Sequence, residues 1–280
     1  NVNDNFYLIS SELKSFNEHP AFKKNLDYKS INNYMQYKYI PTPNTIFSNT
    51  FKLNQGCYAE ISLNDMYFRK YEYWNIQNEI FQYKNVKINE DKIYFKNILK
   101  KTLKSTITNQ LLGDVDIGSF LSGGIDSSLI TSIMSEVSPK KINTFSVGFD
   151  NKEFDESLKA NQIAKTLNTN HHELKLNSKD ILSNIPNIVD IYDEPFSDSS
   201  QIPTYLISKF ASSKLKVCLS GDGGDELFGG YNRYFYTESI WNKVKLIPNP
   251  LREYFFKIIL HTPNSLFIFI QSIINIFFYN

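Results

Sequence analysis

The chain has 280 residues, 41% of them hydrophobic and 15% aromatic, which suffices for one large domain or two ordinary ones with a buried core. Its 30 basic and 29 acidic residues leave a net charge of +1, which gives no support for nucleic acid or a membrane as partner. The two cysteines, Cys57 and Cys218, form no CxxC pair, which argues against a disulfide framework or a zinc site and favours a cytoplasmic location.

The two ends of the sequence lead us to expect a segment of a longer protein. The chain begins "NVNDNFYLISSELK", without an initiator Met and without the basic start and apolar run of a signal peptide. It finishes "SLFIFIQSIINIFFYN", without a helix-stop signal. The apolar stretch Leu266–Tyr279 is short for a membrane span, so we expect a core helix there, with a membrane anchor as the alternative.

The first part of the chain predicts short strands separated by turns. "YIPTPNTIF" and "KLNQGCYAEISL" alternate apolar runs with turn-forming residues. Residues 71–92 are polar and aromatic, and we expect them to connect this part to the next. The apolar residues expected in strands are Tyr58, Ile61 and Leu63.

Beyond this connector, apolar residues at helical spacing alternate with short apolar runs typical of buried strands. Helices are expected over Phe95–Ile107, Ile125–Val137, Leu158–Leu167, Ser178–Tyr192 and Thr204–Ser213, the third of them capped by Asp155. Strands are expected over Val115–Leu121, Ile142–Phe149, His171–Leu176 and Lys216–Ser220. This alternation predicts an α/β fold, a parallel sheet with helices on both faces, whose ligands bind beyond the carboxyl ends of the strands.

The stretch "FLSGGIDSS", Phe120–Ser128, follows an expected strand and opens an expected helix. Gly123 and Gly124 carry no side chain, so backbone N–H groups can approach an anion closely. The positive end of the following helix points at the same place. Hydroxyl donors are added by Ser122, Ser127 and Ser128. The loop therefore predicts a cradle for pyrophosphate.

Asp126 is an unexpected member of an anion site, because a carboxylate repels phosphate. It fits there if a divalent cation lies between the two, which makes Asp126 a candidate metal ligand. No Gly-Lys-Ser/Thr follows the glycines, so the loop is not a Walker A motif. The alternative is a tight strand-to-helix turn with Asp126 as its N-terminal charge.

A second loop, "VCLSGDGGDELFGGYNRY", also starts from a short apolar strand. Three acidic side chains stand among its glycines, and a basic one follows: Asp222, Asp225, Glu226 and Arg233. Carboxylates at this density require a cation or a cationic substrate group to offset them. The alternative is a solvated acidic turn that caps a helix. Two such loops at strand ends of one sheet favour a shared binding site.

Other candidates are weaker. His171 and His172 lie on one expected strand, so we expect one to face the core and the other solvent, and no third ligand indicates a metal site. "YDEPFSDSSQIP" is expected to be an ordinary loop between helices, with a place in the cleft as the alternative. Cys57 is expected to be a small buried residue, and "KKTLK" a solvated helix face.

The two loops resemble the glutamine-dependent asparagine synthetase family. "SGGIDSS" is similar to the pyrophosphate loop of the ATP-pyrophosphatase superfamily, and "LSGDGGDELFGGYNRY" to the second signature of the synthetase domain. "FDESLKANQIAKTLNTNHHEL" and "DEPFSDSSQIPTYLIS" resemble the same family in the same order. The resemblance implies that residues 90–280 form an adenine nucleotide α-hydrolase-like ATP-binding domain, truncated at its C-terminus.

The N-terminal part resembles the end of the family's class II glutamine amidotransferase domain. "LISSELKSFNEHPAF" and "YIPTPNTIFSNTFKLNQGCYAEI" carry this likeness, so residues 1–75 are expected to be the last, β-rich part of an N-terminal nucleophile glutaminase domain. The family's nucleophilic N-terminal Cys and its lysine beyond the second signature have no match here, and Cys57 does not take the nucleophile's role. We therefore expect no glutaminase activity from this segment alone.

The resemblance also implies a reaction. A substrate carboxylate attacks the α-phosphate of ATP, pyrophosphate leaves, and ammonia derived from glutamine displaces AMP from the acyl-adenylate to form an amide. Aspartate is the expected acceptor, and the implied cofactors are ATP and Mg²⁺. The expected partners are small-molecule substrates, without nucleic acid or membrane, and a homodimer is left open.

The site residues implied by the motifs fall into three groups. Those implied to bind the nucleotide are Phe120, Ser122, Gly123, Gly124, Asp126, Ser127, Ser128, Val147, Ser220 and Gly221. Those implied to hold Mg²⁺ are Asp126 and Asp225, and the catalytic group is completed by Asp222. Some family members carry Glu in place of Asp222, where it is tied to the intermediate, so the shorter side chain leaves the role of Asp222 open.

Two rival functions remain. The "DEPFSDSSQIP" stretch also resembles synthetase-like amidotransferases that act on sugar acids of surface polysaccharides, which keep the chemistry and change the acceptor. The other rival is a nucleotide-binding module without turnover, because the nucleophile and the distal lysine have no match.

Overall fold

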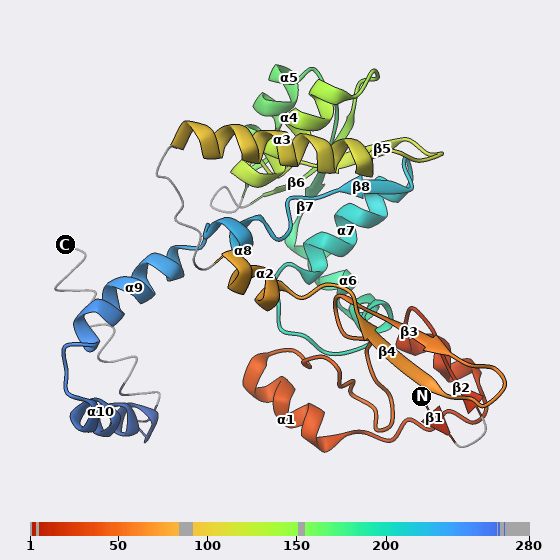
Figure 1. Ribbon diagram of the computed structural model, residues 1–280. Helices are drawn as coiled ribbons and strands as arrows, with labels where there is room; N and C mark the ends of the chain where they lie inside the picture. The colour runs from red at the N-terminus through yellow and green to blue at the C-terminus, as the bar shows by residue number, and fades with distance from the viewer. Residues whose placement is uncertain are drawn as a thin grey trace. The chain divides into compact units, whose positions relative to one another are not determined.

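The computed structural model describes residues 2–3, 6–83, 92–150, 155–261, 263 and 266. The chain forms two compact units, which meet in sequence between Ser220 and Gly221. The first unit contains a small antiparallel region followed by a parallel sheet with helices, and the second is helical (Figure 1).

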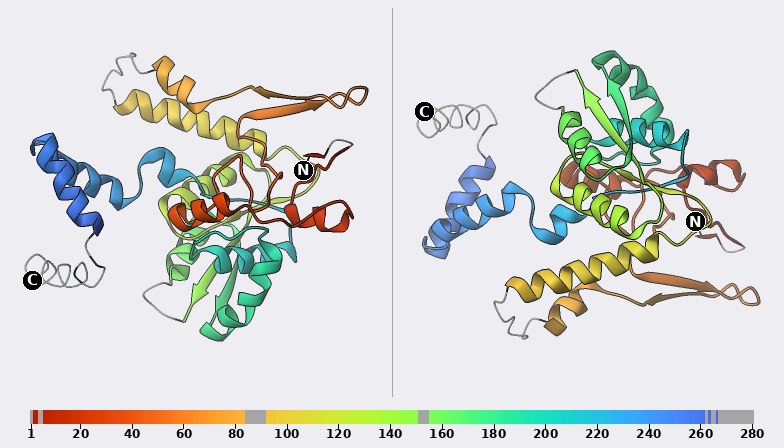
Figure 2. Two further views of the ribbon diagram at one scale, coloured as in Figure 1. Left: turned by 90° about the horizontal axis from the view of Figure 1, so that it is seen from below. Right: turned by 90° about the horizontal axis from the view of Figure 1, so that it is seen from above.

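The N-terminal region is built from short antiparallel pairs and two short helices. Its elements are β1 (Val2–Asn3), β2 (Phe6–Tyr7), the 3₁₀ helix η1 (Leu13–Glu18), α1 (Tyr28–Tyr37), β3 (Cys57–Ile61) and β4 (Phe68–Glu72). β3 and β4 form an antiparallel hairpin, the two-stranded ribbon of Figure 2. The rings of Tyr58 and Tyr71 stack across it with their centres 5.1 Å apart. Short strands were expected here, but Leu63 lies beyond β3 and is 87% exposed.

Two further expectations for this region were wrong. Residues 71–92 are not a simple connector, because β4 continues to Glu72 and α2 (Ile76–Tyr83) follows it. The carboxamide of Asn75 accepts the N–H of Gln77 at 2.8 Å and so starts that helix. Residues 84–91 lie outside the described part. Cys57, expected to be buried, is half-buried at the start of β3.

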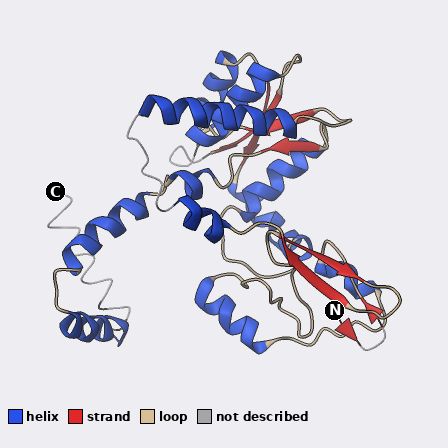
Figure 3. Ribbon diagram, viewed as in Figure 1, coloured by secondary structure: helices blue, strands red, loops and turns tan. Residues whose placement is uncertain are grey.

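The parallel sheet confirms the predicted fold class. Its strands are β5 (Ile117–Phe120), β6 (Asn143–Phe149), β7 (Asn170–Leu176) and β8 (Val217–Leu219), in the order β7-β6-β5-β8. All neighbours are parallel, and Ser119 of β5 pairs with Thr144 on one side and Leu219 on the other (Figure 3). The carboxyl ends of β5 and β8 therefore meet at the same edge.

Helices cover both faces of this sheet, as predicted. They are α3 (Lys92–Gln110), α4 (Ile125–Val137), α5 (Ser157–Thr166), α6 (Ser178–Ile191) and α7 (Gln201–Ser212). The Ser119 hydroxyl lies 2.8 Å from that of Thr131 on α4, and Phe145 packs edge-on against Phe210 of α7 at 5.9 Å. Ser119 and Phe145 point to opposite faces, because Ser119 pairs with the residue before Phe145. Figure 1 shows α3, α4 and α5 above the sheet and α7 below it.

Side chains just before α6 and α5 accept N–H groups at the start of these helices and so fix where they begin. Asn177 caps α6 with a capping box, because its side chain accepts the N–H of Asp180 while the Asp180 carboxylate accepts the N–H of Asn177, each at 3.0 Å. Asp155 was expected to cap α5, and its carboxylate accepts the N–H groups of Ser157 at 3.1 Å and Phe149 at 3.4 Å. It thus ties the end of β6 to the start of α5, although Glu156 holds the N-cap position.

The apolar core lies between the sheet and its upper helices. Its buried members are Ile107, Ile133, Met134 and Ile142. A smaller cluster places Leu121, at the end of β5, against Ala160 and Ala164 of α5. Because alanine side chains are short, α5 can approach the chain closely at the point where it leaves β5.

The two histidines of β7 face opposite sides of the sheet, but neither is exposed. The ring nitrogens of His171 lie 3.0 Å from the Thr144 hydroxyl and 3.1 Å from the Ser146 hydroxyl, whereas the His172 ring stacks on Phe145 at 5.2 Å. We expected one exposed ring, and this was wrong because α7 covers the second face. Burial lowers the pKa of both imidazoles.

The second unit contains α8 (Gly224–Phe228), α9 (Asn232–Val244) and α10 (Asn249–His261). α8 lies between Gly223, with φ of 86°, and Gly229, with φ of 68°, and only glycine adopts such angles without strain. Apart from Leu266, the stretch Leu266–Tyr279 lies outside the described residues. Among the helices that the structure describes, none has the length and apolar content needed to cross a membrane.

Candidate nucleotide-binding site

The loop between β5 and α4 is a close-packed turn at the carboxyl edge of the sheet. Gly123 has a φ of 86°, and a Cβ added there would lie 2.8 Å from the Lys159 Cβ and 3.0 Å from the Ala160 nitrogen. Any other residue would be strained in its backbone and would also push α5 away. Gly123 is therefore required by the turn itself, in addition to the close approach to an anion for which the sequence predicted it.

Gly124 opens the same loop toward α4. It holds the N-cap position of that helix and supplies no side chain to cap it. A Cβ added there would meet the Ser122 hydroxyl at 3.3 Å as its sole neighbour within 4 Å in the described structure. The first N–H groups of a helix have no partner within it and lie at its positive end. This arrangement of donors fits a phosphate group.

The serine hydroxyls brace the loop from within. Ser127 is buried, and its hydroxyl lies 2.9 Å from the Ser122 hydroxyl and accepts the Ser122 N–H at 3.2 Å. Ser128 donates its hydroxyl to the Gly124 carbonyl at 2.6 Å. In this structure the hydroxyls hold the shape of the loop backbone. Their predicted role as ligands of pyrophosphate stays a prediction.

Asp126 lies in the first turn of α4 and is half-buried. Its carboxylate is thus fixed to the same turn as the N–H donors of the loop. A carboxylate beside a phosphate site fits Mg²⁺, which is commonly bound through one or two carboxylates together with phosphate oxygens. The local donor set is consistent with the predicted cradle, and the binding roles themselves stay predictions.

Three further residues implied to bind the nucleotide lie at or near the carboxyl ends of the strands. Phe120 ends β5 and pairs with Phe145, and Val147 stands two residues farther along β6. By the alternation of side chains in strands, Phe120 and Val147 face the side of the sheet that α7 covers. Ser220 directly follows β8, the other neighbour of β5.

The second loop lies in the second unit, which contains Gly221, Asp222 and Asp225. Asp225 begins α8 together with Glu226, where carboxylates are favoured by the helix dipole. A Cβ added to Gly230 would collide with the Asp225 carboxylate, so this glycine leaves room for it. The two loops belong to different units, and their meeting around one ligand stays a prediction.

Glu226 forms a short chain of contacts with two later residues of the second loop. Its carboxylate accepts the hydroxyl of Tyr231 at 2.7 Å, and this hydrogen bond raises the pKa of Tyr231 to about 12. The guanidinium of Arg233 lies 4.2 Å from the centre of the Tyr231 ring. These contacts engage Glu226 and Arg233 within the loop.

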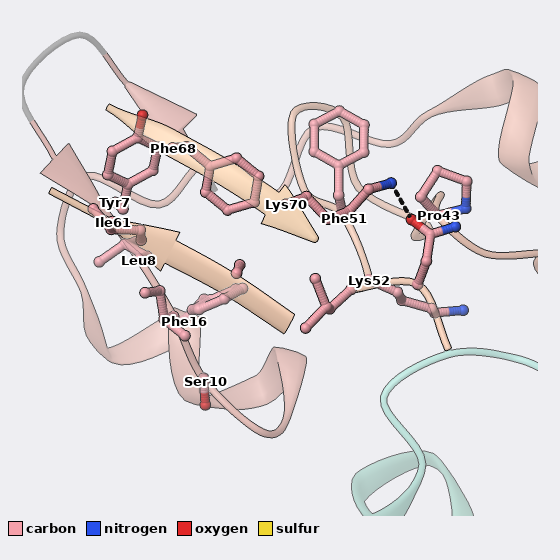
Figure 4. Close-up of a pocket in the computed structure, with 14 residues that line it drawn as sticks. Tyr7, Leu8, Ser10, Phe16, Pro43, Phe51, Lys52, Ile61, Phe68 and Lys70 are labelled. Carbon is pink, nitrogen blue, oxygen red and sulfur yellow. Dashed lines mark hydrogen bonds between the residues drawn. The ribbon is translucent and has the colours of Figure 1, made fainter. Parts of the chain in front are cut away.

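A cavity that the sequence did not predict lies in the N-terminal region. It has a volume of about 650 Å³, and the residues that line it come from the range 7–70 (Figure 4). Its walls are mainly apolar and aromatic, with lysines at the side: Tyr7, Phe16, Phe51, Phe68, Lys52 and Lys70. The alternation of apolar residues in β3 and β4 was the available signal. The cavity is not lined by any residue of the two glycine-rich loops.

His, Cys, Asp and Glu side chains form no group of three or more placed to hold a metal ion in the parts of the chain that the structure describes. The Mg²⁺ ligands Asp126 and Asp225 stay a prediction.

Comparison with known proteins identifies two family domains in the sequence. The asparagine synthase domain matches residues 99–268, and a glutamine amidotransferase domain matches residues 1–74. A provisionally named glutamine-hydrolysing asparagine synthetase of Methanocaldococcus jannaschii is 36% identical over 230 residues, which are 81% of this chain and 43% of that protein. Glutamine-hydrolysing asparagine synthetase 1 of Bacillus subtilis is 33% identical over 256 residues, which are 90% of this chain and 38% of that protein.

The chain thus spans less than half the length of these two relatives. A solved NH3-dependent NAD synthetase of Campylobacter jejuni is 15% identical, with a TM-score of 0.35, and covers 49% of this chain and 60% of its own. A likeness at that TM-score carries no argument about function.

Proposed function

The chain belongs to the asparagine synthase family, and on that premise we propose that its protein is an ATP-dependent amide ligase supplied with ammonia from glutamine. Residues 1–75 are then the end of the glutaminase domain, and residues 90–280 belong to the synthetase domain. The observation that carries the proposal is the β5–α4 loop, in which left-handed Gly123 and the N-cap residue Gly124 place the start of α4 just after the carboxyl end of β5. The N–H groups of the first turn of α4 have no partner within the helix and are the proposed donors. We place the protein in the cytoplasm.

In this proposal the backbone of residues 122–128 binds the pyrophosphate part of ATP. Phe120 and Val147 contact the adenosine from the α7 side of the sheet, and Ser220 and Gly221 line the nucleotide from β8. Fixed N–H dipoles stabilise charge that develops on the leaving pyrophosphate without having to reorganise. Asp126 and Asp225 hold Mg²⁺, which when bound neutralises phosphate charge.

The acceptor carboxylate attacks the α-phosphate, forms an acyl-adenylate and is then amidated by ammonia, with AMP as the leaving group. Aspartate is the acceptor that the names of the relatives support. Asp222 lies between Gly221 and Gly223 of the second loop, and we propose that it contacts the intermediate. If the acceptor is a sugar acid and not aspartate, every other part of this proposal is unchanged.

Calorimetric titration of Mg·ATP into the 280-residue chain tests the nucleotide site. We expect saturable binding that Asp126→Ala weakens by about 10-fold or more, since a phosphate site loses its metal ligand. Asp114→Ala, which removes an exposed acid just before β5, is the matched control and should bind like the wild type. Equal affinity in both variants would remove Asp126 from the site.

A second assay identifies the acceptor in the full-length enzyme. Pyrophosphate release is followed with ATP, Mg²⁺ and ammonia, and with either aspartate or a nucleotide-linked uronic acid. Release with aspartate supports the proposal, whereas release with the sugar acid alone reassigns the acceptor. Tight Mg·ATP binding without release for either acid favours a nucleotide-binding module.

A further inference from the structure

The loop of residues 192–200, between α6 and α7, is held by the N-terminal region at two carboxylates. The Asp193 carboxylate accepts the backbone N–H of Leu13 at 2.5 Å and lies 3.5 Å from the Lys14 ammonium. The same ammonium donates to the Ile191 carbonyl at 2.8 Å, which ties it to the end of α6. Asp193 thus joins this loop to η1, about 180 residues earlier in the chain.

Glu194 repeats the arrangement with a different part of the N-terminal region. Its carboxylate accepts the backbone N–H of Ile46 at 2.7 Å and lies 2.5 Å from the Lys52 ammonium. Lys52 also donates to the Ile40 carbonyl at 3.0 Å. Three residues on, the N–H of Ser197 donates to the Lys38 carbonyl at 2.8 Å. The loop is therefore fixed along most of its length.

Both carboxylates are largely withdrawn from water. The side chains of Asp193 and Glu194 are 16% and 14% exposed. A buried carboxylate needs its partners, because removing one of them leaves an uncompensated charge and an unmade hydrogen bond. Each of these acids accepts one backbone N–H from the N-terminal region and forms an ion pair with one of its lysines. We call Asp193 and Glu194 with these partners the clasp.

The loop that carries the clasp continues into α7, which packs against the sheet. α7 starts at Gln201 and returns the chain to β8, whose first residue Val217 pairs with the first residue of β5, so α7 ends at the amino edge. Phe210 packs against Phe145, and nine helical residues before it span about 13.5 Å. The four residue steps from Phe145 to Phe149 span about 13 Å. The first residue of α7 is therefore about as far along its helix from the Phe145–Phe210 contact as the end of β6 is along its strand.

The clasp also shares elements with the cavity of the N-terminal region. Lys52 lines that cavity, and so does Phe16, which lies in η1 two residues after Lys14 (Figure 4). The same elements therefore wall the cavity and hold the two carboxylates. A change in their packing would reach residues 192–200 through a few direct contacts.

We propose that Asp193 and Glu194 are positioning residues through which the N-terminal region sets the placement of residues 192–200 and of the carboxyl edge behind them. The inference rests on the proposed function. There the N-terminal region belongs to the glutaminase domain and the carboxyl edge of the sheet binds ATP, so the clasp connects these two parts. Neither residue is expected to touch ATP. The clasp itself is a property of the folded chain and is measurable without any ligand.

Hydrogen–deuterium exchange on the 280-residue chain tests the clasp. Both Asp193→Asn and Glu194→Gln keep the shape of the side chain and remove its charge. Exchange should become about 10-fold faster or more than in the wild type, in residues 13–18 and 192–200 of Asp193→Asn and in residues 38–52 and 192–200 of Glu194→Gln, because a buried ion pair has lost one partner. The matched control is Asp190→Asn, an exposed acid at the end of α6, which should exchange like the wild type. Unchanged exchange in both clasp variants would overturn the proposal.

A second variant tests the same ion pair in case Glu194→Gln fails to fold. Lys52→Gln removes the same ion pair from the other side, where the side chain is 35% exposed, and should reproduce the effect of Glu194→Gln. The double variant should then be no worse than either single one, because both remove one shared interaction. Additive effects would overturn the pairwise clasp.

Exchange measured with and without Mg·ATP tests the clasp and the proposed function separately. In the wild type, saturating Mg·ATP should slow exchange both in residues 192–200 and in residues 38–52, and in Glu194→Gln it should no longer slow exchange in residues 38–52. Continued slowing in residues 38–52 of that variant would overturn the coupling. Absence of Mg·ATP binding in the wild type would overturn the proposed function, while the ligand-free comparison would still decide whether the clasp exists.

Discussion

Gly123 and Gly223 share a φ of 86° and open similar sequences, yet different physical demands account for them. The turn at Gly123 is packed against α5, so a side chain there would strike the backbone of that helix. Gly223 has no atom within 4 Å of the position that a Cβ would take in the described structure, and it serves the left-handed cap of α8 alone. The comparison shows that one sequence signal, a glycine before a helix, covers two structural causes.

Alanine at the two positions separates these causes and should give the largest difference. Gly223→Ala should cost about 1 kcal/mol in the free energy of unfolding, because a left-handed residue with a Cβ is strained. Gly123→Ala should cost about 3 kcal/mol or more, because the same strain is joined by overpacking against α5. Denaturant titration measures both, with Trp74 as the reporter of the first unit and Trp241 as that of the second.

Single-tryptophan backgrounds, Trp241→Phe and Trp74→Phe, assign each transition to its unit. Equal costs for the two alanine variants would contradict the packing role of Gly123. A larger cost at Gly223 would reverse the comparison.

The hydrogen bonds inside the two loops should differ in the same direction. Ser127→Ala removes a buried hydroxyl that bonds both the N–H and the hydroxyl of Ser122, and should cost about 1–2 kcal/mol of stability in the first unit. Glu226→Gln alters the exposed bond to Tyr231 and should leave the stability of the second unit unchanged within error. Denaturant titration in the matching single-tryptophan background checks both, and a neutral Ser127→Ala would show that the loop keeps its shape without the serine bridge.

A smaller effect is expected from pH. Burial lowers the pKa of His171, so the unfolded chain binds a proton more readily than the folded one. The stability of the first unit should therefore fall as pH drops below the unfolded value of about 6.5 and go on falling until the lowered pKa is passed. Stability at pH 7.5 and 5.5 measures this fall.

Replacing the imidazole tests the cause of this pH dependence. His171→Gln should reduce the difference between the two pH values, whereas His261→Gln, which lies in the second unit, should leave it as in the wild type. A full-sized fall in His171→Gln would assign it to another group.

The sheet could be predicted from the sequence because its strands are short apolar runs bounded by polar residues. Each of them was expected within a few residues of its place, and Gly123 and Gly124 marked the turn at the edge. α2 was missed because Ile76, Ile80 and Phe81 occupy helical positions in a stretch that reads as polar, and all three are exposed in this chain. The hydrogen bonds of Ser127 within the loop could not be predicted, because a sequence does not show which way a hydroxyl turns.

The clasp of Asp193 and Glu194 could not be predicted for a different reason. Its partners lie 148 and 180 residues away in the chain, and no local pattern pairs a loop acid with a distant backbone N–H. The stretch was expected to be a loop between helices, which is what the structure shows, but its two acids are bonded and not merely solvated. Long-range polar contacts of this kind follow from the fold.

In the proposed function the two glycine-rich loops bind one Mg·ATP together. The most direct measurement is a double-mutant cycle on Mg·ATP affinity, with Asp126→Ala, Asp225→Ala and the variant that carries both. If the two carboxylates share one metal ion, each single variant should lose about 10-fold or more in affinity, and the double variant should lose little beyond that. Wild-type affinity in Asp225→Ala, or losses that simply add, would contradict a shared site.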